Sequence, residues 1–311
     1  MSTVWRILIC DSIDQIGLDI LTKAGMIVDY QPDITFEKLV SQVNRYDVLV
    51  VRSRTKVSKD VIENGSSLKV IARVGVGLDN VDTKYAESKN IQVINAQEAA
   101  TNAVSELVIG FMISLARLIP YAHSELSKGN WLKKSLIGTE LSGKYLGIVG
   151  VGNIGRNVGR IARGMRMNII GYDIYPISRE YVNEVGMINA DLNTLVESSD
   201  FITIHVPLSA DTYHLFDSNL LSRMKKSAYI VNSSRGGIVD ESALYDLLKD
   251  QKIAGAGLDV FEVEPPANKK FLELPNVLCT PHIGAQTKEA QGLAARVISE
   301  KLIHKFQEAS I

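Results

Sequence analysis

Three short segments in the second half of the sequence each supply a side chain suited to proton or anion chemistry. Each follows an apolar run that predicts a β-strand, and they carry Arg235, Glu264 and His282. Ligands of open parallel sheets bind at the C-terminal ends of strands, so we expect these side chains at one edge. An imidazole can take a hydroxyl proton while a carboxylate on its other nitrogen fixes the tautomer. A guanidinium can bind a carboxylate and polarise a carbonyl oxygen.

Other interpretations compete for each of these positions. Glu262 stands two residues before Glu264, and the residues alone do not choose between the two carboxylates. Arg235 could be a surface charge, but the two glycines after it indicate backbone close to a ligand. His282 could be structural, but its position at a predicted strand end favours catalysis.

A glycine-rich turn near the middle of the chain predicts a dinucleotide site. Gly150, Gly152 and Gly155 follow the apolar run 145–149 and open a helix-like stretch. The first two glycines permit a tight turn and close approach to a pyrophosphate, and the third lets the helix pack on the strand. Asp173 ends the next strand-like run, where a carboxylate meets the adenosine ribose. Its charge would repel a 2′-phosphate, so the predicted cofactor is NAD. Oxidation of a 2-hydroxy acid by hydride transfer to NAD would use all three side chains.

Composition limits the class of protein. The 311 residues are 46% hydrophobic and 22% charged, as in soluble globular chains, and the net charge of −1 gives no attraction to nucleic acid or membranes. The N-terminus lacks a signal-peptide pattern, and the apolar stretch 107–119 is too short for a membrane span. Cys10 and Cys279 fit buried reduced thiols. We therefore expect a cytoplasmic protein with a small-molecule substrate, and no cluster has metal-ligand spacing.

Alternating strand and helix signals predict an α/β fold of two Rossmann/flavodoxin-like domains, each a parallel sheet covered by helices. A long helical pattern covers residues 99–118, where Pro120 ends or kinks it, and a charged loop covers 127–135. The last helical stretch, 287–306, must dock on a folded unit, and we expect it to return to the first. The predicted domains are residues 1–97 plus 286–311, for the substrate, and residues 98–285, for NAD, linked by two crossings. The strand-like runs are at 4–10, 26–30, 47–51, 70–73, 91–94, 145–149, 167–172, 201–205, 228–232, 254–259 and 277–279.

These segments, with the runs 73–82 and 138–147, resemble the D-isomer-specific 2-hydroxyacid dehydrogenases over nearly the whole chain. The resemblance implies that Arg235, Glu264 and His282 are catalytic, and it alone favours Glu264 over Glu262. It also implies a homodimer, with residues 99–118 and the following loop as the interface. Because the chain ends soon after its last helix, we expect no separate regulatory domain.

The resemblance also implies the residues that contact NAD, with His205 shaping the adenine side. They lie in the glycine turn, at strand ends and around the predicted catalytic histidine: Gly150, Gly152, Asn153, Ile154, Gly155, Asp173, His205, Val206, Pro207, Ser233, Ser234, Arg235, Asp259, His282, Gly284 and Ala285.

The runs 73–82 and 138–147 are most similar to the branch of the family that oxidises D-3-phosphoglycerate. Backbone amides of Val76 and Gly77, with Arg235 and His282, would then bind the substrate's carboxylate end. A phosphate adds roughly two negative charges. Arg52 and Arg54 follow the third predicted strand, and Arg73 ends the fourth. Lys133 or Lys134 resembles a basic position of that branch, and we expect the phosphate near Arg52, Arg73 and Lys133.

The expected reaction is NAD-dependent oxidation of D-3-phosphoglycerate to 3-phosphohydroxypyruvate, a step of serine biosynthesis. Two other functions fit the sequence. One is a glyoxylate/hydroxypyruvate reductase or another D-2-hydroxyacid dehydrogenase, and the other is a non-catalytic, NAD-sensing protein like a corepressor.

Overall fold

Two compact units make up the computed structural model, which describes residues 4–266 and 269–308. The first comprises Met1–Ala100 and Ala285–Ile311, and the second comprises Thr101–Gly284. Residues 1–3, 267–268 and 309–311, which fall within the predicted domain ranges, lie outside the described residues. The chain therefore passes twice between the units.

The first unit contains a parallel sheet with the strand order β2-β1-β3-β4-β5. Side chains alternate across it, because Ile7 and Ile9 face one core while Leu8 and Cys10 face the other. Sheets buried on both faces need such apolar strands. The strands are β1 (Arg6–Ile9), β2 (Ile27–Tyr30), β3 (Val48–Val51), β4 (Val70–Arg73) and β5 (Gln92–Asn95). The covering helices before the first crossing are α1 (Gln15–Lys23), α2 (Phe36–Gln42), η1 (Val43–Arg45), α3 (Lys59–Asn64) and α4 (Thr83–Ser88).

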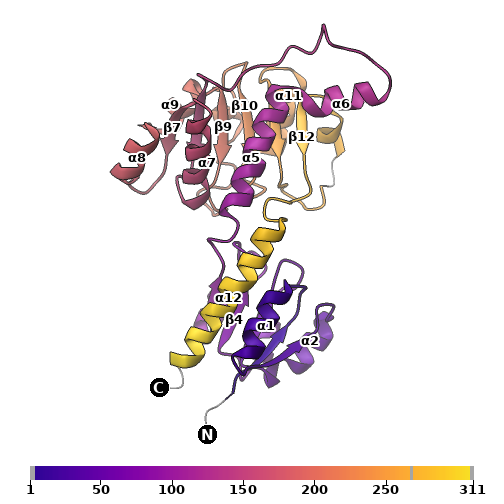
Figure 1. The fold of residues 1–311 in the computed structure, drawn as a ribbon, viewed down its shortest axis with the longest axis vertical. Helices are drawn as coiled ribbons and strands as arrows, with labels where there is room; N and C mark the ends of the chain where they lie inside the picture. Colours follow the sequence, from indigo (N-terminus) through magenta and orange to yellow (C-terminus); the bar gives the residue numbers. More distant parts are fainter. Residues whose placement is uncertain (1–3, 267–268, 309–311) are drawn as a thin grey trace. The chain divides into compact units, whose positions relative to one another are not determined.

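The C-terminal helix α12 (Lys288–Glu308) completes the first unit by packing along α1 (Figure 1). Gly17 permits the close approach, because a Cβ there would lie 3.1 Å from the Cβ of Ala295. The hydroxyl of Ser299 donates a hydrogen bond to the carbonyl of Gly17 at 3.2 Å. Two segments far apart in the sequence thus share one core.

The second unit contains a parallel sheet with the strand order β12-β11-β10-β9-β6-β7-β8. Its strands are β6 (Tyr145–Val149), β7 (Asn168–Tyr172), β8 (Ile188–Asn189), β9 (Phe201–Ile204), β10 (Tyr229–Asn232), β11 (Gly255–Leu258) and β12 (Val277–Cys279). Helices α5 (Thr101–Ala116) and α7 (Asn153–Gly164) lie side by side across one face (Figure 1). The other face packs on α9 (Leu192–Ser198), α10 (Ser218–Leu221) and α11 (Glu241–Lys249). The remaining helices are α6 (Ile119–Ser127), α8 (Arg179–Val185) and η2 (Lys269–Glu273). The two sheets confirm the predicted α/β fold.

Pro120 was expected to end or kink the predicted helix 99–118, and the structure bends by 61° at a break just before it. Helix α5 ends at Ala116, Leu118 takes a left-handed φ of 55°, and α6 starts with Pro120 in its first turn. Proline suits the first turn because an N–H there has no acceptor within the helix, so no hydrogen bond is lost when proline lacks it. Helix α6 continues to Ser127. Strand β8 was not predicted, because its two residues are exposed and form no apolar run.

No single helix within residues 4–266 and 269–308 is long and apolar enough to span a membrane. Helices α5 and α6 pass that test only when they are taken together, across a bend of 61°.

Candidate active site

The glycine turn after β6 leaves an open surface between a strand and a helix. Gly150 has a φ of +92°, and a Cβ there would lie 2.8 Å from the backbone of His205. A Cβ on Gly155 would lie 2.1 Å from the carbonyl oxygen of Gly150, so this glycine brings α7 against the turn. Around Gly152, in contrast, a Cβ would meet no described atom within 4 Å. The turn therefore has the shape that the pyrophosphate of a dinucleotide requires.

Helix α7 starts directly from this turn without a side-chain cap. Its N-cap residue is Gly152, whereas side chains such as Asp14 and Asp240 cap α1 and α11. The first N–H groups of a helix have no partner within the helix. The amides that follow Gly152, among them those of Asn153 and Ile154, are thus available to a phosphate.

Asp173 lies immediately after β7, beside the glycine turn. Its Oδ2 accepts a hydrogen bond from the N–H of Val151 at 2.7 Å, and its Oδ1 accepts one from the N–H of Tyr175 at 2.9 Å. Each carboxylate oxygen can accept more than one hydrogen bond, so both remain able to bind ribose hydroxyls.

His282 and Glu264 form a hydrogen-bonded pair beyond the ends of β12 and β11. The Nδ1 of His282 lies 2.8 Å from Oε2 of Glu264, and Glu264 Oε1 accepts from the N–H of Phe261 at 3.2 Å. Because an ionised carboxylate can only accept, Nδ1 carries the proton and Nε2 has a lone pair in the neutral ring. The side chains are 48% and 39% exposed, so a substrate can reach them.

The structure separates the two competing glutamates. Glu262 pairs with His214, whose Nε2 lies 2.9 Å from its Oε1, and its N–H donates to Oε1 of Glu241 at 2.6 Å. Glu264, not Glu262, is the carboxylate that contacts His282.

Asp259 holds the loop that carries His282, a role that the sequence did not reveal. This buried carboxylate accepts from the Thr280 hydroxyl at 2.6 Å and from the N–H groups of Ile283 and Gly284 at 2.7 and 2.8 Å. His282 itself has a left-handed φ of 52°. Non-glycine residues rarely keep that conformation unless surrounding contacts enforce it, as they do at functional sites.

Arg235 follows β10 and lies in a loop that Asn232 organises. The side chain of Asn232 donates to the carbonyl of Arg235 at 2.9 Å and accepts from the N–H and hydroxyl of Ser234 at 3.1 and 2.8 Å. A Cβ on Gly236 would lie 1.8 Å from the carbonyl oxygen of Phe261, so this loop packs against the one that carries Glu264. The buried hydroxyl of Ser233 has no hydrogen-bond partner within the described residues. Asn232 belongs to an apolar run, and no sequence signal distinguished it.

The remaining predicted cofactor residues of the second unit border the same edge of the sheet. His205 accompanies Val206 and Pro207 after β9, and its Nε2 lies 2.9 Å from the Thr203 hydroxyl. Burial lowers the pKa of His205 to about 3, so this imidazole is neutral at physiological pH. Gly284 lies against Asp259, and Ala285 is the first residue of the returning segment.

The first unit contains a turn with two available amides. Within the described residues, the N–H groups of Val76 and Gly77 donate to no protein acceptor, while Asn95 holds the Val76 carbonyl at 2.6 Å. The guanidinium of Arg73 lies over Gly75, since a Cβ on that glycine would be 1.6 Å from Nη1. The two amides could bind a carboxylate, and the guanidinium could bind a further anionic group.

The arginines after β3 differ in their contacts. Arg52 uses Nη1 to bond the carbonyl of Ser12 at 3.1 Å. Arg54 bonds the carbonyls of Cys10, Pro32 and Ile34 and pairs with Asp11 at 3.1 Å. Arg54 therefore serves the fold of the first unit. Lys133 is an exposed residue of the second unit, in the segment after α6.

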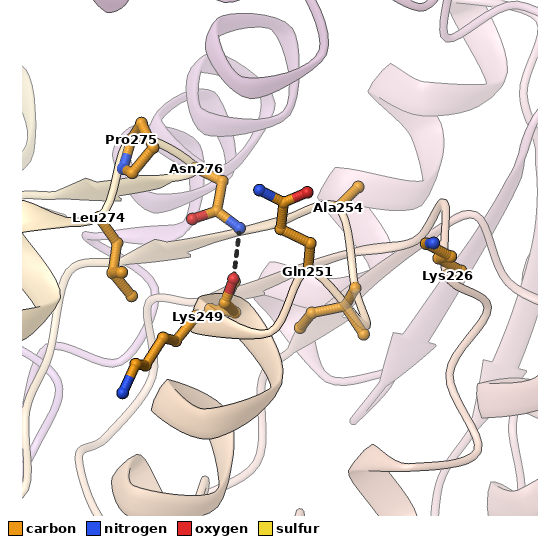
Figure 2. Close-up of a pocket in the computed structure, with 9 residues that line it drawn as sticks. Lys226, Lys249, Gln251, Ala254, Leu274, Pro275 and Asn276 are labelled. Carbon is orange, nitrogen blue, oxygen red and sulfur yellow. Dashed lines mark hydrogen bonds between the residues drawn. The ribbon is translucent and has the colours of Figure 1, made fainter.

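A cavity of about 310 Å³ lies at the opposite strand ends of the second unit, before β10, β11 and β12. Figure 2 shows Lys226 and Lys249 on different sides of it, with their ammonium groups far apart. Asn276 in its wall donates to the carbonyl of Leu248 at 3.2 Å. The lysines do not converge on a common anion. No group of three or more His, Cys, Asp or Glu residues within 4–266 and 269–308 could hold a metal ion.

Comparison with known proteins places these observations in a family. The model of the NAD binding domain of D-isomer specific 2-hydroxyacid dehydrogenases matches residues 109–284. A D-3-phosphoglycerate dehydrogenase of Methanocaldococcus jannaschii is 46% identical over 96% of this chain and 56% of its own length. A hydroxypyruvate reductase of Thermotoga maritima is 42% identical over 99% of both chains.

Solved structures give the same result. A glyoxylate reductase from Paecilomyes thermophila superposes with a TM-score of 0.90 at 28% identity, over 98% of this chain and 96% of that one. The D-lactate dehydrogenase of Aquifex aeolicus complexed with NAD and lactic acid has a TM-score of 0.84 at 25% identity, over 98% and 96%. The chain spans about half the length of the curated phosphoglycerate dehydrogenases it matches.

Proposed function

The chain belongs to the D-isomer specific 2-hydroxyacid dehydrogenase family, and from this we propose that it oxidises D-3-phosphoglycerate to 3-phosphohydroxypyruvate with NAD, a step of serine biosynthesis. The observation that carries a dehydrogenase function is the His282–Glu264 pair, 2.8 Å apart, on an NAD-binding domain. Relatives at 46%, 41% and 39% identity that bear the name D-3-phosphoglycerate dehydrogenase support the substrate.

The residues of the second unit fit the NAD cofactor. Gly152 leaves the turn open, the uncapped start of α7 offers N–H groups to the pyrophosphate, and Asp173 offers carboxylate oxygens to the ribose. Bound there, NAD would supply the hydride acceptor for oxidation of the substrate at C2.

His282 is the proposed base. Its Nε2 takes the proton of the substrate's C2 hydroxyl, because Nδ1 already donates to Glu264. The resulting imidazolium is stabilised by the ionised Glu264, which also keeps the ring in the productive tautomer. In the reverse direction the same Nε2 returns the proton to the carbonyl oxygen.

Arg235 is the proposed carboxylate and carbonyl ligand in the second unit. A guanidinium binds a carboxylate with two parallel hydrogen bonds and stabilises negative charge on a nearby oxygen. In the first unit, the Val76 and Gly77 amides are available to a carboxylate, and Arg52 and Arg73 are the proposed phosphate ligands there. Lys133 is the proposed phosphate ligand of the second unit.

Hydroxypyruvate reduction is the second candidate. The relative of that name is 42% identical to this chain over 310 residues, close to the identity of the phosphoglycerate dehydrogenases. The two candidates share the chemistry of His282 and differ in the need for phosphate ligands.

An activity panel distinguishes the two candidates. The purified chain is assayed with NAD and 3-phosphoglycerate, glycerate, lactate or 2-hydroxyglutarate, and with NADH and 3-phosphohydroxypyruvate, hydroxypyruvate or glyoxylate. We expect the highest kcat/KM among the hydroxy acids with 3-phosphoglycerate, and a lower value for hydroxypyruvate than for 3-phosphohydroxypyruvate. A preference for hydroxypyruvate would favour the second candidate, and binding of NAD without any turnover would favour an NAD-sensing protein.

We further propose a cytoplasmic homodimer that forms through α5, α6 and the following segment. Exposed apolar side chains gather on α6 and that segment, and such patches mark interfaces. They are Ile119, Tyr121, Leu126, Trp131 and Ile137. A largely apolar cavity of about 460 Å³ is lined by the end of α5 and the start of α6. The unpaired state of Cys10 and Cys279 fits a reducing compartment.

Sedimentation velocity tests the dimer. We expect wild-type protein to sediment as a dimer and the double variant Trp131→Glu/Ile137→Glu as a monomer, while Leu293→Glu, an exposed position on α12, leaves the dimer intact. A monomeric wild type at micromolar concentration contradicts the proposal.

A further inference from the structure

His214 and Glu262 form a second histidine–carboxylate pair in the second unit, distinct from the His282–Glu264 pair. His214 has a left-handed φ of 50°, which a non-glycine residue keeps only where surrounding contacts enforce it. The ring of Tyr213 stacks on the imidazole at a centroid distance of 4.0 Å and an interplanar angle of 14°. The second pair is therefore a built feature and not a chance surface contact.

The backbone of His214 contacts the loop that carries Arg235. Its N–H donates to the carbonyl of Gly237 at 2.7 Å, and the N–H of Phe216 donates to the carbonyl of Ile238 at 3.0 Å. Gly237 stands two residues after Arg235 and has a φ of +78°. His214 thus fixes the end of the loop that places Arg235.

The side chain of His214 contacts the loop that carries Glu264. Its Nε2 bonds Glu262, two residues before Glu264, at 2.9 Å. The residue before Glu262, Phe261, donates its N–H to Oε1 of Glu264, and Oε2 of Glu264 bonds His282. A series of bonds and adjacent residues therefore connects His214 to the proposed catalytic histidine.

The surroundings of His214 are rich in carboxylates. Oδ2 of Asp240 lies 3.8 Å from Nδ1, and Glu241 exchanges hydrogen bonds with Glu262 at 2.6 and 3.3 Å. Burial raises the pKa of Glu241, and the charges of Glu262 and Glu264 add to the rise. The His214 imidazole faces Asp240 and Glu262, and its removal leaves Glu262 beside other carboxylates without the hydrogen bond from Nε2.

We propose that His214 is a positioning residue that holds the Arg235 loop and the Glu264 loop in register, so that Glu264 meets Nδ1 of His282. The inference rests on the proposed dehydrogenase function, because it assigns His282 and Arg235 their catalytic roles. It predicts that loss of the His214–Glu262 bond affects turnover and not NAD binding.

Kinetics of matched variants test this role. His214→Leu removes the donor to Glu262, and we expect kcat to fall about tenfold or more, the effect of losing one hydrogen bond to a charged group. The dissociation constant of NAD changes less than about twofold, within the scatter of distant substitutions. His214→Gln keeps an N–H donor near Nε2, and we expect it to restore most of kcat. His304→Leu removes a surface histidine that pairs with Glu308 at 3.3 Å in the first unit, and we expect no change.

A double-mutant cycle separates the bond from general damage. Glu262→Ala removes the same bond by deleting its acceptor. The kcat of the double variant His214→Leu/Glu262→Ala is therefore expected to be no lower than that of the less active single variant. Additive losses would overturn the proposed link. The cycle starting from His214→Gln replaces this one if His214→Leu does not fold.

Nitrogen NMR of the protein without cofactor gives a readout that is independent of activity. Two-bond proton–nitrogen spectra at alkaline pH show which ring nitrogen of His282 carries the proton, and the His282→Asn variant assigns the signals. We expect the Nδ1–H form in wild type and His214→Gln, and a shift toward the Nε2–H form in His214→Leu. An unchanged tautomer and kcat in a folded His214→Leu protein would overturn the inference while leaving the proposed function standing. A wild type inactive on every 2-hydroxy acid would remove both.

Discussion

In each unit a turn joins the first strand to the helix that follows it, β1 to α1 and β6 to α7, and the two turns differ in the residues that fill them. After β1, Asp11 is buried, accepts from the Thr55 hydroxyl at 2.6 Å and pairs with Arg54 at 3.1 Å. After β6, the turn is built around glycines, and a Cβ on Gly152 would meet no described atom within 4 Å. The Asp11 side chain thus fills the first turn with contacts to protein, whereas the second turn keeps open space at Gly152, where we propose that the pyrophosphate binds. The same layered fold thus carries a glycine turn in one unit and a turn filled by a buried carboxylate in the other.

The largest expected effect tests whether the chemistry belongs to the strand ends of the second unit. His282→Asn removes the proposed base but keeps an N–H donor for Glu264. We expect kcat to fall about 10²–10⁴-fold with little change in NAD affinity, and Glu264→Gln to do less damage. Steady-state rates and NAD titration measure both. Nearly normal turnover in His282→Asn would show that this edge does not carry the chemistry.

A side chain added at Gly152 should fill the turn after β6, as Asp11 fills the turn after β1, and so weaken NAD binding. Gly152→Val has room to fold, because no described atom lies within 4 Å of a Cβ there. It would occupy the proposed pyrophosphate position, and we expect the dissociation constant of NAD to rise about a hundredfold, equivalent to roughly 3 kcal/mol. Calorimetric titration measures the change. Gly110→Ala adds a methyl group to equally open space on α5 and should leave NAD binding unaltered, so equal losses in both variants would contradict the assignment.

Arg52 and Arg54 of the first unit are expected to differ in role, Arg52 in substrate binding and Arg54 in the stability of the fold. Arg52→Ala is expected to raise KM for 3-phosphoglycerate about tenfold, the loss of one charge-assisted contact, with little effect on glyoxylate. Arg54→Ala is expected to lower the melting temperature instead, because its guanidinium bonds three backbone carbonyls. Equal loss on both substrates in Arg52→Ala would make that arginine structural as well.

The preference for NAD over NADP tests the role of Asp173, the carboxylate beside the glycine turn. We expect a clear preference for NAD over NADP, and Asp173→Ala to narrow it several-fold, about 1 kcal/mol, by removing the charge beside the ribose. This variant also loses the bond to the N–H of Val151, so NAD binding weakens at the same time. Initial rates with both cofactors decide, and equal use of them by the unmodified protein would disprove the role.

The smallest effect concerns the histidine that packs on the glycine turn. Burial lowers the pKa of His205 to about 3 from its ordinary value of about 6.5, so the unfolded chain binds the extra proton first as pH falls. Stability from the neutral imidazole is complete above about 6.5 and is lost as pH falls toward 3. Denaturant unfolding between pH 4 and 7 should therefore show a weaker pH dependence in His205→Gln than in wild type. Identical slopes would show that His205 is not protected from protonation.

Local patterns predicted most of the fold because parallel sheets buried on both faces require short apolar strands. The run 70–73 became β4 without change, and the run 145–149 became β6. Strand β8 escaped prediction because both its residues are exposed at the edge of the sheet. Helix α6 was not predicted, because a proline can equally end one helix or stand in the first turn of the next.

The sequence by itself determined the two parallel sheets, the glycine turn and the family, because each depends on the order of residue types along a short stretch. It could not choose between Glu262 and Glu264 without the family pattern, nor identify Asn232 and Asp259 as the residues that shape the Arg235 and His282 loops. Those assignments depend on which strand ends become neighbours when β10, β11 and β12 pair. A hydrogen bond between residues such as Glu264 and His282, far apart in the chain, exists only after those strands have brought their loops together.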